Sequence, residues 1–375
     1  MAKKDRKIAI TGGHLTPALA VIEELQQRGG WQILFFGRKH TAEGDQTPSM
    51  ESQIIAEEEI PFVPIEAGRI QRRFTRHTIP ALLKIPLGFI QAFYYLVKFH
   101  PDIILSFGGY VSVPVVVAGW ILGIPSVTHE QTTVKGLATR LNSLFVKNIA
   151  VSWPQTVKEF PVGKVVLTGN PIRQDIFKVR EKFWRTLDFY KDMPSVFITG
   201  GNQGFHLLNE IVNKVLPKLL QKTNLFHQCG HLDATGDFEK LEIAKQRLPV
   251  RLRGRYHVKK YLTTQEMGTF LNYADLIVCR AGANTITELA VLGKPALLIP
   301  IPYASEQIQN AQMLANAGIA QILPQNELSP ESLVSSINKM LESIAFYQDN
   351  AAKAKKLVDL SASKKIVDLL GEVVE

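Results

Sequence analysis

The chain lacks several patterns that identify common classes of nucleotide-binding enzyme. It has no Asp-x-Asp pair, no G-x-x-x-x-G-K-[ST] loop, and no G-x-G-x-x-G turn followed by an acidic residue at the expected distance. These absences argue against a carboxylate-held metal diphosphate, a P-loop ATPase and a nicotinamide enzyme, respectively. We therefore expect neither a metal nor a cofactor.

Long apolar runs and paired cysteines are missing as well. No apolar run reaches the roughly 18 residues that span a bilayer. The best candidate, "VPVVVAGWILGIP" at 113–125, contains proline and glycine and predicts a buried helix. The basic amino terminus is not followed by an apolar region, which argues against a secretory signal. Cys229 and Cys279 lie far apart and predict inert buried thiols in a reducing cytoplasm.

Acidic residues are outnumbered, with 34 Asp and Glu against 43 Lys and Arg and a net charge of +9. A basic protein favours an acidic partner, which includes nucleic acid, an anionic membrane and a phosphorylated substrate. The sequence shows no recognition helix, aromatic RNA platform or zinc finger. We therefore expect no nucleic acid partner.

Short apolar runs alternate with amphipathic segments along all 375 residues. "KIAIT" at 7–11 precedes a helical pattern to about residue 28, and "SVFITGG" at 195–201 precedes one at 205–221. This alternation predicts parallel, doubly wound α/β sheets. A break near 168–180 predicts two Rossmann-like lobes, whose ligands would bind at the carboxyl ends of the strands.

Four glycine turns follow predicted strands. They read "TGGH" (11–14), "FGGY" (107–110), "GGNQG" (200–204) and "RAGAN" (280–284). Glycine lets the backbone approach a ligand closely, and the next helix presents N–H groups and a positive dipole end. Four such turns predict a phosphorylated ligand in the cleft between the lobes.

The last of these turns leads into a helix with two competing interpretations. Thr285-x-x-Glu288 has the spacing of a capping box, in which Glu288 would bind only backbone. Alternatively, the amides of 283–285 hold a diphosphate while the Glu288 carboxylate accepts hydrogen bonds from the two ribose hydroxyls. The segment by itself leaves both open. Gly293 and Pro295 predict where the helix stops.

Several stretches resemble, in order, the motifs of the MurG family of peptidoglycan N-acetylglucosaminyltransferases. They are "GGYVSVPVVVAGWILGIPSVTHEQ" (108–131), "TGNPIR" (168–173), "GGNQGFHLLN" (200–209), "HQCG" (227–230) and "YADLIVCRAGANTITELAVLGKPALLIPIPYASEQIQNAQ" (273–312). The resemblance implies a GT-B fold of two Rossmann-like lobes around a cleft. The implied parts are an acceptor and membrane lobe over 1–168, a UDP-sugar lobe over 169–345, and a last helix within 346–375 that returns to the first lobe.

The resemblance also implies an activity. The enzyme would move N-acetylglucosamine from UDP-GlcNAc onto the muramyl 4-hydroxyl of lipid I, with inversion and without metal, giving lipid II for peptidoglycan. Its partners would be both substrates and the anionic inner face of the cell membrane, where it would be peripheral. Two alternatives stay open: another UDP-sugar-dependent transferase with a different lipid acceptor, and a non-catalytic paralogue.

Donor-site residues follow from the resemblance, position by position. Glu288 would bind ribose, the backbone of Leu262 would read uracil, and Gln307 would contact the sugar. Other donor-site positions are Thr11, Gly12, Gly13, Thr132, Arg173, Asn202, Gln203, Gly282, Ala283, Asn284 and Thr285. Thr132 stands where the family has asparagine, Asn202 where it commonly has serine, and the first glycine loop is shorter than the family's.

Inverting transfer needs a base for the acceptor hydroxyl. We expect His14, whose imidazole titrates near neutral pH; the alternatives are that His14 caps a helix or binds phosphate. Glu130 and His129 are competing candidates whose alternative is a structural turn. The acceptor-site positions are Gly108, Gly109, Tyr110, His129 and Gln131.

A basic, apolar segment at 67–101 contains no acidic residue. Basic residues around apolar side chains suit docking on anionic lipid. The membrane-contact positions are Arg72, Arg73, Phe74, Arg76, Leu82 and Leu83. The alternative is a core helix with a solvated basic edge, and from residue 88 onward we expect core.

Overall fold

The computed structural model describes residues 5–38, 49–66, 68, 78–187, 189–231 and 235–375. Its contacts divide the chain into two compact units. Unit 1 comprises residues up to 173 together with 359–375, and unit 2 comprises 174–358. The boundaries predicted from the sequence lie after residues 168 and 345.

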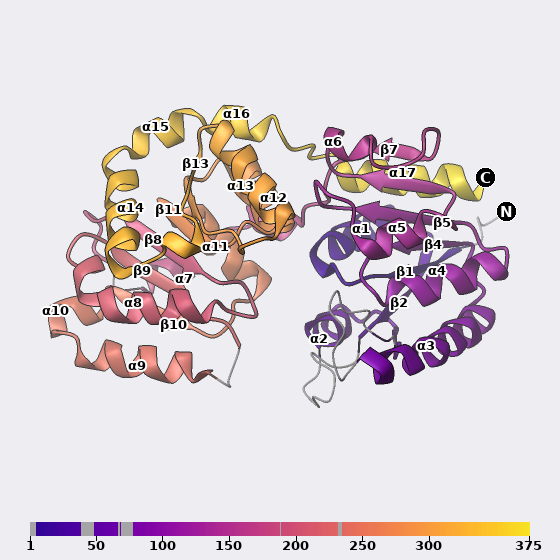
Figure 1. The fold of residues 1–375 in the computed structure, drawn as a ribbon, viewed down its shortest axis with the longest axis horizontal. Helices are drawn as coiled ribbons and strands as arrows, with labels where there is room; N and C mark the ends of the chain where they lie inside the picture. Colours follow the sequence, from indigo (N-terminus) through magenta and orange to yellow (C-terminus); the bar gives the residue numbers. More distant parts are fainter. Residues whose placement is uncertain (1–4, 39–48, 67, 69–77, 188, 232–234) are drawn as a thin grey trace. The chain divides into compact units, whose positions relative to one another are not determined.

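Unit 1 is built on a seven-stranded parallel sheet in the order β3-β2-β1-β4-β5-β6-β7 (Figure 1). Its strands are β1 (Arg6–Thr11), β2 (Trp31–Gly37), β3 (Phe62–Pro64), β4 (Ile103–Ser106), β5 (Ser126–Glu130), β6 (Asn148–Val151) and β7 (Val165–Leu167). Its helices are α1 (Leu15–Arg28), α2 (Met50–Glu57), α3 (Thr78–Phe99), α4 (Ser112–Ile121), α5 (Leu137–Asn142), α6 (Pro154–Val157) and α17 (Ala362–Val374).

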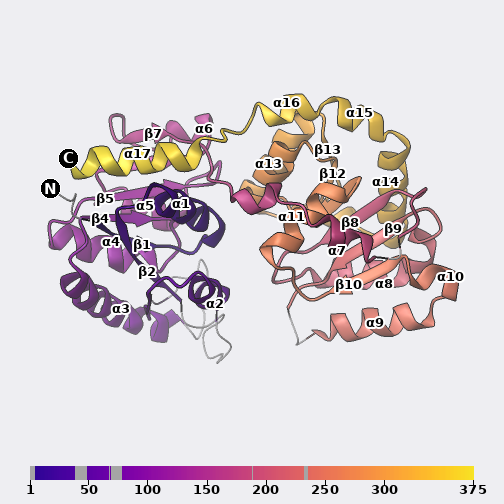
Figure 2. The ribbon, with the colours of Figure 1, turned by 180° about the vertical axis from the view of Figure 1, so that it is seen from behind.

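Alternate residues of the central strands of unit 1 enter two different cores. Ile8 and Ile10 of β1 pack with α1 and α17, whereas Ala9 between them packs with α3 and α4. Because both faces of the sheet are covered, the strands read as continuous apolar runs. Figures 1 and 2 both show α17, drawn in yellow, among the elements of unit 1.

Unit 2 repeats this plan on a six-stranded parallel sheet in the order β10-β9-β8-β11-β12-β13. Its strands are β8 (Ser195–Thr199), β9 (Asn224–Gln228), β10 (Tyr256–Lys259), β11 (Leu276–Cys279), β12 (Ala296–Leu298) and β13 (Ala320–Ile322). Its α-helices are α7 (Glu181–Arg185), α8 (His206–Leu219), α9 (Asp237–Arg247), α10 (Val250–Arg253), α11 (Thr264–Tyr273), α12 (Ala283–Leu292), α13 (Ser305–Asn316), α14 (Pro330–Glu342), α15 (Ile344–Asp349) and α16 (Ala351–Lys355). Short 3-10 helices cover Gln174–Phe177 and Gln325–Glu327.

The strand order changes direction between β1 and β4 in unit 1 and between β8 and β11 in unit 2. In an open parallel sheet, the carboxyl ends of the strands at such a switch point form the usual ligand site. All four glycine turns follow these four strands. The predicted doubly wound sheets are confirmed, and each sheet places two glycine turns at its switch point.

The predicted buried thiols are confirmed, and the predicted buried helix is confirmed except at its end, where Trp120 and Ile121 are exposed. Residues 112–121 form α4, whose Val115, Val116 and Ala118 are fully buried. Cys229 and Cys279 are buried free thiols, and burial raises the pKa of each to about 12, which keeps both protonated at neutral pH. Within the described ranges, no helix combines the length and apolar character that crossing a bilayer requires.

Candidate active site

The two glycine turns of unit 1 lie directly against each other. A Cβ on Gly12 would meet the Cβ of Phe107 at 2.8 Å, and one on Gly109 would meet the backbone nitrogen of Gly13 at 2.8 Å. The N–H of Gly13 donates to the carbonyl of Gly108 at 3.0 Å. Side chains larger than hydrogen would separate these turns, so the close approach explains the glycines at 12 and 109.

A buried polar network supports the second turn from below. The hydroxyl of Ser106 accepts from the N–H of Gly108 at 3.2 Å and from Nδ2 of Asn142 at 3.1 Å. Nδ2 of Asn142 also donates to the hydroxyl of Ser112 at 2.8 Å, and this hydroxyl donates to the carbonyl of Gly109 at 2.8 Å. The network fixes the backbone of Gly108 and Gly109. The network could not be predicted from the sequence, because Asn142 lies at least thirty residues from its partners Ser106 and Ser112 and these residues form no motif.

His14 stands between the first glycine turn and α1. It occupies the N-cap position but makes no side-chain capping hydrogen bond, so the capping alternative is wrong. Burial lowers the pKa of its imidazole below 6.5; the Glu130 carboxylate opposes this and the Arg38 guanidinium adds to it. A lowered pKa keeps the ring neutral, which is the form that accepts a proton.

Arg38, directly after β2, is a further residue of this edge that the sequence analysis missed. Its guanidinium donates to Oε1 of the buried Glu51 at 2.9 and 3.2 Å, and it makes a side-chain hydrogen bond with Tyr110. Its pKa is raised, because these interactions with Glu51 and Tyr110 outweigh the cost of burial. The predicted acceptor residue Tyr110 is therefore held beside a permanent positive charge.

Glu130 ends β5 and is 1% exposed. Its Oε1 accepts from the hydroxyl of Thr132 at 2.6 Å, and its Oε2 accepts from the N–H of Gly136 at 2.9 Å. Both carboxylate oxygens therefore hold the turn that follows β5. This geometry favours the structural alternative for Glu130, with Glu130 acting on His14 through its charge, and it places the predicted donor residue Thr132 in the same turn.

His129 is fully buried and binds the crossover segment after β7. Its Nε2 lies 3.2 Å from the carbonyl of Gly169 and 3.2 Å from the hydroxyl of Ser152. A carbonyl only accepts, so Nε2 carries the proton. Burial lowers the pKa of His129 to about 4, and the ring is neutral at physiological pH. These contacts favour the structural alternative for His129.

The remaining predicted positions of unit 1 are largely enclosed by protein. Thr11 is fully buried in β1, and Gln131 is 3% exposed. The Arg173 guanidinium lies within unit 1, where Nε is 3.5 Å from Glu23 and Nη2 is 3.9 Å from Glu58. Both carboxylates compete with a phosphate for this arginine.

In unit 2, the turn after β8 is pressed against the end of β9. A Cβ on Gly204 would meet the carbonyl oxygen of Cys229 at 2.4 Å, and one on Gly230 would meet the Cα of Gly204 at 2.1 Å. Asn202 and Gln203 are exposed at the tip of the turn. Oδ1 of Asn202 accepts from Nε2 of Gln228 at 3.1 Å, which fixes that side chain.

The turn after β11 overturns one interpretation of the segment from residue 279 to 302. Helix α12 begins at Ala283 with Gly282 as its N-cap, and it has no acidic residue in its first turn. Glu288 therefore lies in the second turn, so the capping-box interpretation of Thr285-x-x-Glu288 is wrong. A glycine N-cap has no side chain to satisfy the first N–H groups, which suits an anion-binding helix end.

Two residues fix the loop before α12, and neither was expected. The buried Asn310 of α13 donates to the carbonyl of Ala281 at 3.0 Å. Arg280 donates to the carbonyl of Ile299 at 3.0 Å and stacks with its guanidinium carbon 3.3 Å from the ring centroid of Phe205. Burial lowers the pKa of Arg280 to about 10, which leaves it charged at neutral pH. The guanidinium of Arg280 therefore lies next to both glycine turns of unit 2, the one after β8 and the one after β11.

The other predicted donor positions lie in two further loops of unit 2. Leu262 is buried between β10 and α11, where Thr263 and Glu266 form a capping box. Gln307 lies in the first turn of α13, and its Oε1 accepts from the N–H of Ile301 at 3.1 Å. That bond fixes the amide group of Gln307 beside the loop after β12.

Some predicted positions cannot be placed. Arg72, Arg73, Phe74 and Arg76 lie outside the described residues; Leu82 and Leu83 belong to α3, but their side chains are not described. Among the residues that are described, no three His, Cys, Asp or Glu side chains gather in a way that could hold a metal ion.

Two parallel α/β units, each with paired glycine turns at a switch point, define the GT-B class of fold. Solved structures agree: the UDP-GlcNAc 2-epimerase of Neisseria meningitidis covers 98% of this chain and 100% of its own, with a TM-score of 0.67 and 15% identity, which supports the fold alone. The family models for the Glycosyltransferase family 28 N-terminal and C-terminal domains match residues 11–151 and 195–369. The chain belongs to glycosyltransferase family 28.

More similar relatives share a single name. An enzyme of Clostridium kluyveri called UDP-N-acetylglucosamine–N-acetylmuramyl-(pentapeptide) pyrophosphoryl-undecaprenol N-acetylglucosamine transferase is 34% identical over 97% of this chain and 99% of its own. A second transferase of that name from Bacillus cereus is 32% identical over 92% and 94%. The crystal structure of Acinetobacter baumannii MurG shares 28% identity over 98% and 99%, with a TM-score of 0.69. The resemblance to the MurG family is confirmed.

Proposed function

We propose that the protein transfers N-acetylglucosamine from UDP-GlcNAc to the muramyl 4-hydroxyl of lipid I and so forms lipid II. The observation that carries this proposal is end-to-end similarity to transferases named for that reaction, combined with two preserved switch-point edges. Unit 2 supplies the donor edge and unit 1 supplies the acceptor edge. The retained sites argue against a non-catalytic paralogue.

At the donor edge, α12 and Glu288 divide the recognition of UDP. The uncapped amino end of α12 and the turn at 200–204 receive the diphosphate, with Arg280 as the nearby cation. Glu288, one turn further along α12, accepts hydrogen bonds from the ribose diol. Backbone amides and a guanidinium stabilise the departing UDP in this proposal, and no metal takes part.

At the acceptor edge, His14 is the proposed general base. Burial lowers its pKa and its side chain makes no capping hydrogen bond, whereas the ring of His129, whose pKa is also lowered, binds the carbonyl of Gly169. The neutral ring removes the proton of the muramyl 4-hydroxyl as that oxygen attacks the anomeric carbon from the face opposite UDP, which inverts the configuration.

The first test is a reaction of the purified protein with UDP-GlcNAc and a short-chain lipid I analogue in the presence of EDTA. We expect mass spectrometry to find a product heavier by one N-acetylhexosamine. UDP binding without any product would instead favour a different lipid acceptor. Loss of product on chelation alone, with restoration by a divalent cation, would contradict the metal-free mechanism.

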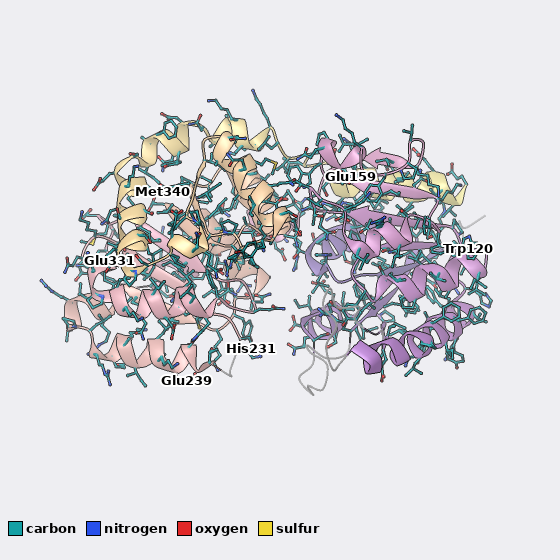
Figure 3. The ribbon with its side chains drawn as sticks, in the orientation of Figure 1. Trp120, Glu159, His231, Glu239, Glu331 and Met340 are labelled. Carbon is teal, nitrogen blue, oxygen red and sulfur yellow. The ribbon has the colours of Figure 1, made fainter. Side chains whose placement is uncertain are left out.

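We also propose that unit 1 docks on the anionic inner face of the cell membrane as a peripheral protein. The outer face of α3 exposes apolar side chains at helical spacing, and α4, which packs on α3, ends with two more. This apolar face comprises Leu87 (43% exposed), Ile90 (62%), Tyr94 (58%), Val97 (40%), Trp120 (56%) and Ile121 (54%). Figure 3 labels Trp120 at the end of α4.

The charge pattern around this apolar face favours anionic lipid. From residue 67 to 158 the acidic residues are Asp102 and Glu130, and Glu130 is buried, whereas Lys98, Arg140 and Lys147 are exposed. Apolar side chains that enter the lipid boundary, together with nearby cations, suit a peripheral protein. The expected core from residue 88 onward forms one stripe of α3, where Ala92 and Leu96 are fully buried, and the opposite, exposed stripe extends the proposed membrane contact beyond residue 87.

Changing Ile90 and Trp120 together to serine is expected to reduce sedimentation with phosphatidylglycerol vesicles at least tenfold, because each buried apolar side chain contributes about 1.5–3 kcal/mol. Turnover of a soluble acceptor analogue should not change. The matched control is Ile243→Ser, which alters an exposed residue of α9 in unit 2. Unchanged sedimentation of the double variant would contradict membrane docking through this face.

A further inference from the structure

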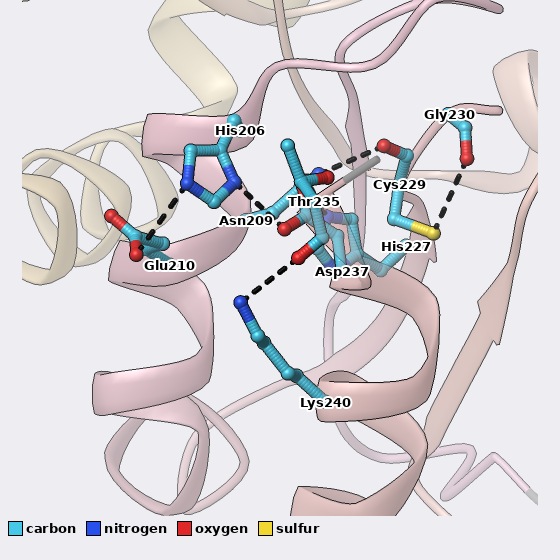
Figure 4. A network of polar contacts seen from close by, with 9 residues as sticks. All are labelled: His206, Asn209, Glu210, His227, Cys229, Gly230, Thr235, Asp237 and Lys240. Carbon is cyan, nitrogen blue, oxygen red and sulfur yellow. Dashed lines mark hydrogen bonds and ion pairs between the residues drawn. The ribbon is translucent and has the colours of Figure 1, made fainter. Parts of the chain in front are cut away.

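A chain of buried polar side chains lies behind the glycine turn at 200–204, at the junction of α8, α9 and β9 (Figure 4). Asn209 is its centre and is 2% exposed. Its Nδ2 donates to the carbonyl of Cys229 at 2.8 Å and to Oδ2 of Asp237 at 2.7 Å, and its Oδ1 lies 3.0 Å from Nε2 of His227. Both N–H groups and the oxygen of this amide are thus engaged, with partners at the end of β9 and at the start of α9.

The hydrogen positions in this network follow from the chemistry of its members. The amide Nδ2 of Asn209 must donate to a carbonyl and a carboxylate, so Oδ1 accepts from Nε2–H of His227. The Nδ1 of His227 then accepts from the hydroxyl of Tyr256 at 3.0 Å. Burial lowers the pKa of His227 to about 3, which agrees with a neutral ring carrying one proton.

The other end of the network reaches the surface at the start of α8. Oδ1 of Asp237 lies 2.7 Å from Nδ1 of His206, and Nε2 of that ring lies 3.5 Å from Glu210. Asp237 is the first residue of α9, and His206 is the first residue of α8. Asn209 therefore connects both helix starts to the end of β9.

What Asn209 fixes is the backbone that the glycine turn rests on. Asn209 donates to the carbonyl oxygen of Cys229, which lies against Gly204: a Cβ on Gly204 would be only 2.4 Å from this oxygen. The next residues continue the contact, since the N–H of His231 donates to the carbonyl of Asn202 at 3.0 Å. A shift of the 229–231 backbone would therefore move the turn at 200–204.

Packing alone does not require these polar groups. The surrounding core of α8, α9 and β9 is apolar, with Leu208, Val212 and Leu241 buried beside the network. A buried amide must have its partners satisfied, and a well-packed apolar residue often stabilises a core equally well. The bond to Cys229 gives the amide a task that an apolar side chain cannot perform.

We propose that Asn209 is a positioning residue for donor binding, which acts by fixing the Cys229 carbonyl and, through it, the turn at 200–204. The inference rests on the proposed function, in which that turn receives the diphosphate of UDP. Asn209 touches no ligand itself. It keeps the amides of the turn in the arrangement that the diphosphate requires before UDP binds. Binding therefore does not have to order the turn, which favours affinity.

The test compares Asn209→Leu with wild-type protein by calorimetry with UDP and by steady-state turnover of UDP-GlcNAc. Leucine has nearly the same size but cannot hold the carbonyl of Cys229. We expect the Kd for UDP and the KM for UDP-GlcNAc to rise about tenfold, while kcat at saturating donor changes less than about twofold. Asn209→Ser, which also loses the bond to Cys229, should behave alike and decides the matter if the leucine variant does not fold.

Two controls separate positioning from general destabilisation. Asn213→Leu makes the same change one turn along α8, at a half-buried position outside the network, and should leave the UDP affinity unchanged. Asp237→Asn lowers stability by removing the charged partner of His206, but it leaves the bond between Asn209 and Cys229, so its Kd for UDP should stay within about twofold of wild type.

The outcomes separate this inference from the function on which it depends. Wild-type UDP affinity in a folded Asn209→Leu or Asn209→Ser variant would overturn the positioning role and leave the proposed function standing. Equal loss of affinity in Asp237→Asn would also overturn it, because affinity would then follow stability. If wild-type protein bound no UDP, the proposed function itself would be wrong.

Discussion

Replacing His14 with glutamine is expected to lower kcat for transfer by about 10²–10⁴-fold, the usual contribution of a general base. Glutamine keeps a polar side chain of similar length but cannot accept the proton of the acceptor hydroxyl. Affinity for UDP should change less than about twofold, because His14 lies in unit 1 and the proposed UDP contacts lie in unit 2.

The pH dependence of the wild-type protein gives a second, independent signature of His14. Burial lowers the pKa of this imidazole, so the neutral form persists below pH 6.5. The kcat/KM profile should therefore be flat around neutral pH and decline only as the pH falls through the lowered pKa. In His14→Gln, that acidic limb should disappear along with most of the activity.

A matched variant and a competing outcome complete this prediction. His100→Asn removes an exposed histidine of the same unit; asparagine tolerates its positive φ of 52°, and kcat should not change. If His14→Gln raised KM for the lipid acceptor but kept kcat, His14 would bind phosphate instead of a proton. Glu130 would then return as the candidate base, although its oxygens hold the turn at 132–136.

Local patterns were sufficient to predict the architecture. Alternating apolar runs and helical segments have different periods, and two buried sheet faces make the strands continuously apolar, so the doubly wound class follows from the sequence. Glycine turns after strands are equally local signals. The structure explains why particular positions are glycine. A Cβ on Gly12 would collide with the Cβ and backbone of Phe107, and a Cβ on Gly109 or Gly204 would collide with a neighbouring backbone.

The spacing of Thr285 and Glu288 shows where a local pattern is ambiguous. A Thr-x-x-Glu sequence can be a capping box or an ordinary pair of residues on one face of a helix. Only the position of the N-cap distinguishes the two. The N-cap of α12 is Gly282, and a capping box is instead formed by Thr263 and Glu266 at the start of α11. Sequence-based helix starts are uncertain by a few residues, which is enough to exchange the two interpretations.

Long-range polar contacts could not be predicted at all. Asn142 fixes the turn at 108–109, Asn310 fixes the loop before α12, and Asn209 fixes the carbonyl of Cys229. Asn142 and Asn310 lie on helices about thirty residues after the loops that they support. Asn209 lies on α8, twenty residues before Cys229 and in the preceding βα repeat. No periodicity or spacing marks such a residue, since its partner is chosen by the fold.

Changing Glu288 to glutamine is expected to weaken UDP binding at least tenfold, because a charge-assisted hydrogen bond contributes about 1.5–3 kcal/mol and a neutral amide offers one acceptor where the carboxylate offers two. Glu288 is half-buried in the second turn of α12, and its charge lies close enough to Cys279 to help raise the pKa of that thiol. The carboxylate is therefore located at the carboxyl end of β11.

The effect on stability should be small in comparison. Glu288 is not part of a capping box, so no helix cap is lost, and a substitution at a half-buried position away from such features usually changes stability by about 0.5 kcal/mol. We expect the Tm to stay within about 2 °C of wild type. The control is Glu342→Gln on α14, a well-exposed carboxylate of the same unit, which should alter neither affinity nor Tm.

Calorimetry with UDP and with 2′,3′-dideoxy-UDP then identifies what Glu288 recognises. Wild-type protein should prefer UDP by at least about tenfold, since the dideoxy ligand lacks both hydroxyls that the carboxylate accepts from. In Glu288→Gln the two ligands should bind with nearly equal affinity, because the group that distinguishes them has changed. If the preference for UDP survived the substitution undiminished, the ribose would be read elsewhere, and Glu288 would keep only its electrostatic influence on β11.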